Sequence, residues 1–139
     1  MVPYRIILAD NYAPLRQGLR RVLDEQTDLE ITGEAGEALD LLKLLNSSAA
    51  GPLTVILGPS LPNLPKTEAI RTIKAAHPET KVLILSMHED VEYLKQALSA
   101  GAEGYLIVEH IDKELLRAIE TIREGKVYVP ISRFPLGSL

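Results

Sequence analysis

The sequence contains no cysteine and no tryptophan, and its 139 residues include only five tyrosines and one phenylalanine. Without cysteine there is no disulfide scaffold and no zinc site built on thiolates. No apolar run is long enough to cross a bilayer, and the apolar stretch 6–9 is too short for the core of a signal peptide. We therefore expect a cytoplasmic protein that has no membrane partner.

The charge of the chain is mildly acidic, with 15 Lys and Arg against 19 Asp and Glu and a net charge of -4. Broad nucleic-acid binding requires clustered basic residues, so this balance argues against it. Hydrophobic residues make up 46% and charged residues 24% of the chain, which is typical of a globular protein. At 139 residues we expect one domain, whose core needs no metal or disulfide.

The apolar pattern switches repeatedly between strand-like runs and helical stripes. The runs that predict strands are 4–10, 29–35, 53–57, 81–86 and 104–108. The stripes that predict helices are 14–23, 38–45, 67–77, 91–98 and 111–122. Residues 46–52 have the composition of a loop, and residues 131–139, rich in Pro, Gly and Ser, read as a linker or tail.

Strands that are apolar throughout and alternate with helices form a parallel sheet covered on both faces. We therefore predict an α/β fold over residues 1–130, with a doubly wound five-stranded parallel sheet in a three-layer (βα)5 sandwich of the flavodoxin-like type. Ligands of such sheets bind beyond the carboxyl ends of the strands. The candidate site residues at these ends are Asp10, Asn11, Gly58, Ser86 and Val108.

Several segments together resemble a known family. Gly58 follows an apolar strand and precedes the proline-studded loop 59–65, and the segments 7–11, 16–19, 82–88 and 100–106 have the same local style. This pattern is similar to the receiver domain of two-component response regulators, and in particular to those of LuxR-type transcription factors. The resemblance implies a phosphorylation site at the carboxyl ends of the strands.

The resemblance also implies a role for each site position. The phosphate-accepting aspartate of the family falls at Gly58, its phosphate-contacting lysine at Val108, and one of its two acidic residues at Asn11. Asp10 retains the other acidic residue. The hydroxyl and aromatic residues of the family's conformational switch match Ser86 and Tyr105.

An aspartyl phosphate requires a carboxylate nucleophile, a magnesium ion and a cation that holds the phosphoryl oxygens. We therefore expect a degenerate pseudo-receiver with no catalytic residue, no enzyme activity, no cofactor, no metal site and doubtful Mg²⁺ binding. Phosphorylation of Ser60, Ser86 or Asp10 instead of the missing aspartate is the first alternative. Without the resemblance, Gly58 would be interpreted as a strand terminator. We interpret Asp10 as an acidic residue that stabilises the start of a helix, in preference to a metal ligand.

A flavin-binding module is a second alternative, because the topology allows it. However, the turn after the first strand lacks a hydroxyl-rich phosphate loop. DNA binding would need a helix-turn-helix domain, which this chain does not contain. We interpret Lys66 as a solvated surface residue.

A phosphorylation-independent receiver would act through protein contacts, with a signalling protein or with a second copy of itself. The expected contact surface lies on the fourth helix, fifth strand and fifth helix. Its mixed charges suit a two-fold homodimer. Its members are Glu92, Lys95, Gln96, Tyr105, Lys113 and Arg117.

Overall fold

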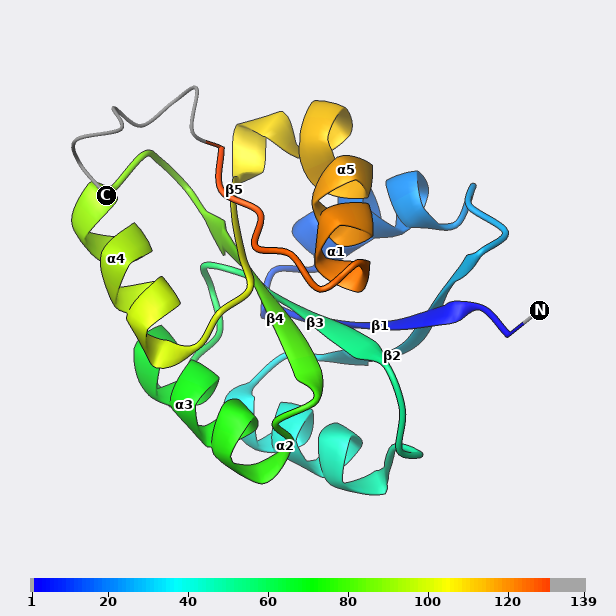
Figure 1. Cartoon of the computed structure of the whole chain (residues 1–139), viewed down its shortest axis with the longest axis horizontal. Helices are drawn as coiled ribbons and strands as arrows, with labels where there is room; N and C mark the ends of the chain where they lie inside the picture. Colours follow the sequence, from blue (N-terminus) through cyan, green and yellow to red (C-terminus); the bar gives the residue numbers. More distant parts are fainter. Residues whose placement is uncertain (1, 131–139) are drawn as a thin grey trace.

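Five parallel strands form one sheet with helices on both of its faces (Figure 1). The computed structural model describes residues 2–130. The strands, in the spatial order β2-β1-β3-β4-β5, are β1 (Tyr4–Ala9), β2 (Leu29–Ala35), β3 (Leu53–Leu57), β4 (Thr80–Ser86) and β5 (Gly104–Ile107). The helices are α1 (Ala13–Leu23), α2 (Ala38–Ser47), α3 (Lys66–Ala76), α4 (Val91–Ala100) and α5 (Ile111–Arg123). The predicted fold class is confirmed.

The helices divide the core into two apolar clusters, one on each face of the sheet. On one face α1 and α5 contribute Leu19 and Leu115 to the core. On the other face α2, α3 and α4 contribute Leu41, Ile70 and Leu94. Each helix thus buries one apolar stripe against the sheet, as its periodicity predicted.

Burial along the strands follows their position in the sheet. Every side chain of β3, in the middle of the sheet, is buried. The edge strand β2 instead alternates between exposed and partly buried residues up to Ala35. A strand that is covered on both faces has a continuous run of buried residues. The central strand β3 has this pattern, and the edge strand β2 does not.

Most of the predicted elements shift by one or two residues at an end, and two of these shifts have a visible cause. The helix α2 includes Asn46 and Ser47, which were expected in a loop. Its last turn is completed because the hydroxyls of Ser47 and Ser48 both donate to the carbonyl of Leu44. At the other boundary, Val108 belongs to the 3₁₀ helix η1 (Val108–His110) rather than to β5, since β4 ends at Ser86 opposite Ile107.

The segment after α5 covers the edge of β5. The amide of Tyr105 donates to the Tyr128 carbonyl at 3.0 Å, and the amide of Tyr128 donates to the Glu103 carbonyl at 2.9 Å. The Tyr128 hydroxyl is buried and bonds the carboxylate of Glu114 on α5. This pairing protects an otherwise open sheet edge. The predicted linker at 131–139 lies outside the described residues.

Candidate functional site at the carboxyl ends of the strands

The strand order reverses between β1 and β3, which lie side by side in the sheet. Asp10 and Gly58 directly follow these two strands. Their backbones extend the sheet pairing, because the Asp10 amide donates to the Ala35 carbonyl at 3.0 Å and the Gly58 amide donates to the Ala9 carbonyl at 2.8 Å. The sheet therefore fixes both residues at the point where doubly wound folds bind their ligands.

The carboxylate of Asp10 is 1% exposed and is bonded at both oxygens. Its Oδ1 accepts from the Tyr12 amide at 2.7 Å, and its Oδ2 accepts from the Ser60 amide at 2.8 Å. The Asn11 amide also donates to the Ser60 carbonyl at 2.8 Å. Asp10 thus ties the loop after β1 to the loop after β3 with charge-assisted hydrogen bonds.

The Asp10 side chain occupies the space that a side chain on Gly58 would need. A Cβ atom on Gly58 would lie 2.7 Å from Asp10 Cγ and 2.8 Å from Asp10 Cβ, and closer still to Oδ2. Such distances lie below any ordinary carbon contact, because attractive carbon contacts occur at about 3.5 to 4.0 Å. Only glycine fits at position 58 while Asp10 keeps this conformation.

Neither Asn11, at the second position of the family's acidic pair, nor Ser60, in the loop after β3, adds a free carboxylate or carbonyl to the site. Asn11 is exposed. Its side-chain amide oxygen would lie 3.6 Å from a Cβ atom added to Gly36, the residue that follows β2. The carbonyl of Ser60 already accepts from the backbone amide of Asn11. Among residues 2–130, no three side chains of His, Asp or Glu gather in a way that could hold a metal ion.

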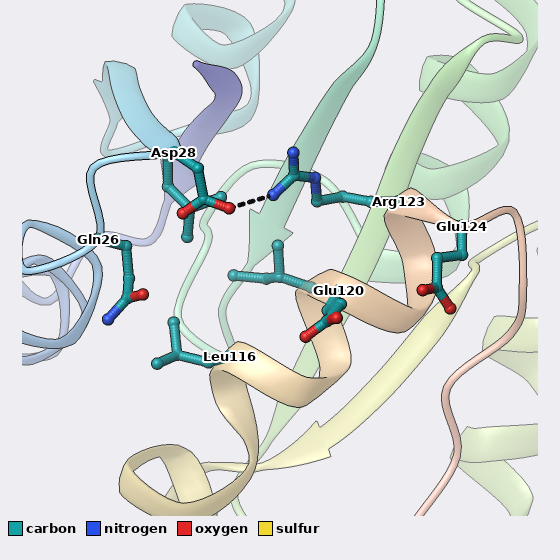
Figure 2. Close-up of a pocket in the computed structure, with 8 residues that line it drawn as sticks. Gln26, Asp28, Leu116, Glu120, Arg123 and Glu124 are labelled. Atoms are coloured by element: carbon teal, nitrogen blue, oxygen red, sulfur yellow. Dashed lines mark hydrogen bonds and ion pairs between the residues drawn. The ribbon is translucent and has the colours of Figure 1, made fainter. Parts of the chain in front are cut away.

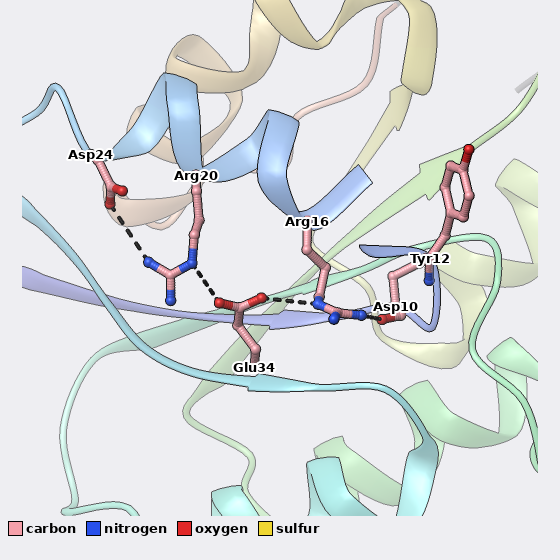
Figure 3. A network of polar contacts seen from close by, with 6 residues as sticks. All are labelled: Asp10, Tyr12, Arg16, Arg20, Asp24 and Glu34. Carbon is pink, nitrogen blue, oxygen red and sulfur yellow. Dashed lines mark hydrogen bonds and ion pairs between the residues drawn. The ribbon is translucent and has the colours of Figure 1, made fainter. Parts of the chain in front are cut away.

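A network of charged residues supports the end of β1 (Figure 3). Arg16 on α1 donates to the backbone carbonyl of Asp10 and forms an ion pair with Glu34 of β2 at 2.9 Å. Arg20 bonds the other oxygen of Glu34 and lies 3.9 Å from Asp24. Sequence reasoning missed this network; the four-residue spacing of Arg16, Arg20 and Asp24 on one helix face could have suggested it.

The two switch positions share one acceptor in the loop between β4 and α4. The hydroxyl of Ser86 donates to the His88 carbonyl at 2.8 Å, and the hydroxyl of Tyr105 approaches the same carbonyl at 3.4 Å. The ring of Tyr105 is edge-on to the ring of Tyr93 on α4, with 5.8 Å between centroids and 71° between planes. Ser86 and Tyr105 are therefore brought together around the backbone of His88.

Tyr105 is fully buried, with 0% exposure, so its prediction as an exposed interface residue was wrong. It lies on a strand covered by α4, and Tyr93 packs against it. Burial raises the pKa of the Tyr105 hydroxyl, and a bond with Ser86 partly opposes this rise. The other five predicted contact residues are exposed: Glu92, Lys95 and Gln96 on α4, and Lys113 and Arg117 on α5.

Val108 is half-buried and packs against the cluster formed by α1 and α5, to which Leu15 also contributes. The structure thus joins Asp10 with Gly58, and Ser86 with Tyr105, while Val108 belongs to the apolar packing of α1. The place at which the family resemblance puts a lysine carries an aliphatic side chain in this chain.

A separate hollow of about 470 Å³ lies between α5 and the loop after α1 (Figure 2). Asp28 and Arg123 form an ion pair across it at 2.8 Å, and Leu116 and Glu120 lie along the helix that borders it. This hollow lies at the amino ends of the strands, because Asp28 precedes β2 and Arg123 ends α5. It is therefore remote from Asp10.

No helix among residues 2–130 is long and apolar enough to span a membrane.

Comparison with known proteins agrees with this arrangement. The family described as "Response regulator receiver domain" matches residues 6–120. The chain belongs to the response regulator receiver domain family. It is 34% identical over 122 residues to an uncharacterized transcriptional regulatory protein, YxjL, of Bacillus subtilis, a match that covers 88% of this chain and 55% of that protein.

Other similar proteins include an oxygen regulatory protein and a LuxR-family response regulator. The oxygen regulatory protein NreC of Staphylococcus aureus is 35% identical over 129 residues, covering 90% of this chain and 57% of the relative. A crystal structure of a LuxR-family two-component response regulator from Aurantimonas sp. SI85-9A1 superposes with a TM-score of 0.83 at 28% identity, covering 91% of this chain and 89% of that one. The chain spans about half the length of the curated relatives it matches.

Proposed function

We propose that this receiver domain is a pseudo-receiver, which is not phosphorylated in the usual way and acts through phosphorylation-independent protein contacts. The observation that carries the proposal is the position of the Asp10 carboxylate, which fills the space beside Gly58. Both oxygens of this carboxylate are bonded to backbone amides. The pocket thus lacks the nucleophile, and its remaining carboxylate has a structural task.

Phosphoryl transfer to aspartate depends on several charged groups acting together. In this chain the position of the acceptor is Gly58 and that of the lysine is Val108, which packs against apolar side chains. Mg²⁺ is bound in proteins mainly through carboxylates and waters. With Asn11 in place of one carboxylate and Asp10 engaged with two amides, we expect at most weak Mg²⁺ binding.

The alternative acceptors are less well supported. Asp10 is buried and its oxygens already accept two hydrogen bonds. The hydroxyl of Ser86 donates to the His88 carbonyl, and no general base among residues 2–130 bonds it. For the flavin alternative, the loop between β1 and α1 consists of Asp10, Asn11 and Tyr12 and lacks the serine and threonine hydroxyls that would bind a flavin phosphate.

We place the proposed function in a regulatory protein, because the relatives include a transcriptional regulatory protein and an oxygen regulatory protein. In such a protein this domain would form a homodimer or bind a signalling partner, and a separate helix-turn-helix domain would bind DNA. The contact surface that we propose comprises the exposed charged residues of α4 and α5. Glu92 has the opposite charge to Lys95, Lys113 and Arg117, which suits a self-complementary contact.

A structural mimic of phosphorylation tests the proposal in solution. We expect that beryllofluoride with Mg²⁺ leaves the amide spectrum of the isotopically labelled protein unchanged, because no carboxylate is available at position 58. Saturable changes at Asp10, Ser86 and Tyr105 would contradict the proposal.

A further inference from the structure

A pocket of about 400 Å³ lies between the start of α3 and the face of α4, next to the end of β4. Its volume is within the range of about 300 to 1,000 Å³ that small-molecule sites occupy. It is distinct from the Asp10 site and shares only Ser86 with the predicted phosphorylation residues. Its walls differ in character, one of them basic and polar and the other mainly apolar.

The basic wall is formed by the first residues of α3. Lys66 was predicted to be a solvated surface lysine, but it is half-buried and lines this pocket. Its ammonium has no ion pair or hydrogen bond with any residue in 2–130. Thr67 follows it, and its hydroxyl has no bond in the described part of the chain either. The helix α3 begins after Pro65 without a side-chain cap, so its positive end adds to the ammonium.

The opposite wall offers an apolar surface and two polar groups. Met87 and the ring of Tyr93 provide the apolar part, and 58% of Met87 is exposed. The Tyr93 hydroxyl is buried and has no hydrogen-bond partner among the described residues. Burial raises the pKa of this hydroxyl, which therefore remains a donor at neutral pH. Gln96 adds a side-chain amide on the next turn of α4.

One carboxylate also lines the pocket, and it already has a partner. Asp90 accepts from the Tyr93 amide at 3.0 Å and so caps the start of α4. Of the two residues in the lining that carry a full charge at neutral pH, Lys66 is therefore the one without a partner. This difference favours an anionic ligand over a cationic one.

We propose that this pocket binds a small organic anion, whose acidic group lies against Lys66 and Thr67 and whose apolar body lies against Met87 and Tyr93. The pocket is bordered by the loop whose His88 carbonyl holds the hydroxyls of Ser86 and Tyr105. A ligand that prefers one conformation of this loop would shift the switch by its differential affinity. This regulatory consequence rests on the proposed function, whereas the binding site does not.

Benzoate is the probe, because it joins a carboxylate to an apolar ring, and benzamide is its uncharged counterpart. We expect saturable benzoate-dependent changes in the amide resonances of Lys66, Met87 and Tyr93, at concentrations up to about 10 mM, the range of weak single-site ligands. Benzamide should bind more weakly by a factor of about five or more, as expected for loss of one partly desolvated charge contact. No phosphodonor is added.

Two variants make the test specific. Lys66→Gln should weaken benzoate binding by about fivefold or more. The matched control is Lys43→Gln, at an exposed lysine of α2 outside this pocket, and it should leave the affinity unchanged. Equal binding by wild type and Lys66→Gln, equal binding of benzamide, or the absence of saturable changes would overturn the site.

The regulatory consequence has its own readout, the amide resonances of Tyr105 and Leu106 on the far side of the loop. Changes there that saturate together with those of Lys66 would support it. Binding that leaves Tyr105 unchanged would overturn the regulatory consequence while the site stands. None of these outcomes bears on phosphorylation at position 58, which is tested separately.

Discussion

The Asp10 carboxylate and the Cα of Gly58 are packed so closely that no side chain fits between them. Asp10 reaches this position because the amides of Tyr12 and Ser60 each bind one of its oxygens. Two loops of the site are thereby joined through a single buried side chain. The acidic side chain after β1 thus fills the space beside the residue that follows β3.

Substitution of Gly58 by alanine should destabilise the protein. The added methyl group would displace Asp10 from its two amide partners, and overpacking of this kind costs about 1 to 3 kcal/mol. Urea denaturation measures the loss. The control is Gly18→Ala on α1, where a Cβ meets nothing within 4 Å and where alanine is favoured over glycine by about 0.5 to 1 kcal/mol.

A double-mutant cycle with Asp10→Ala shows whether the two residues are coupled. If the Asp10 carboxylate causes most of the strain, the effect of Gly58→Ala should fall by at least half once that carboxylate is removed. Equal destabilisation of wild type and Asp10→Ala by the glycine substitution would show that the carboxylate is not the group that causes the strain.

Restoration of the acceptor alone should not restore phosphorylation. In Gly58→Asp the new carboxylate competes with Asp10 for the same space, and Asn11 and Val108 still lack the charges that hold metal and phosphate. We expect no efficient labelling by acetyl phosphate, measured by intact mass. Efficient labelling of this single variant would show that Asn11 and Val108 matter less than argued.

The buried tyrosines should make the protein sensitive to alkaline pH. Burial raises the pKa of Tyr93 and Tyr105 in the folded state, and also that of Tyr4. Below the ordinary tyrosine pKa of about 10, both states are protonated and the full stability is present. As the pH rises further, the unfolded state loses protons that the folded state keeps, so the free energy of unfolding falls.

Tyr93→Phe isolates one part of this dependence. Above about pH 10 the variant should lose stability less steeply than wild type. At neutral pH it should be at least as stable, because it removes a buried hydroxyl that has no partner among the described residues. Tyr12→Phe, at a ring that is 61% exposed, is the comparison variant. If the free energy of unfolding of Tyr93→Phe fell with pH as steeply as that of wild type, the Tyr93 hydroxyl would not contribute to this dependence.

Dimer formation should occur without any phosphodonor. Charge reversal at Lys95 or Arg117 should weaken the dimer, and added salt should do the same because it screens exposed charges. Sedimentation velocity over a range of protein concentrations measures the association. Monomer alone up to about 100 μM, where even a weak interface would associate, would exclude the proposed contact.

The fold could be predicted because its determinants are local in the sequence. Apolar runs such as Leu53–Leu57 and helical stripes such as that of α5 define each element and the face it buries. That Gly58 and Val108 are uncharged can be read from the sequence, but the roles expected at these two positions came from the family resemblance. The boundary near Ser47 could not be predicted, because it depends on serine hydroxyls that complete the last turn.

The features of the site that escaped prediction depend on three-dimensional pairing. The burial of Tyr105 follows from the packing of Tyr93, which comes from a different element. The contact of Arg16 with Glu34 depends on how α1 lies along β2. The position of the Asp10 carboxylate beside Gly58 depends on the backbone amide of Ser60, 50 residues away in the sequence.

The most direct test of the account is the intact mass of the purified protein after incubation with acetyl phosphate and Mg²⁺. A receiver domain that has aspartate at the acceptor position serves as the positive control. The account predicts that the control gains one phosphoryl group while this protein gains none, because Gly58 offers no nucleophile and Asp10 is engaged with two backbone amides. A stoichiometric gain of one phosphoryl group by this protein would contradict it.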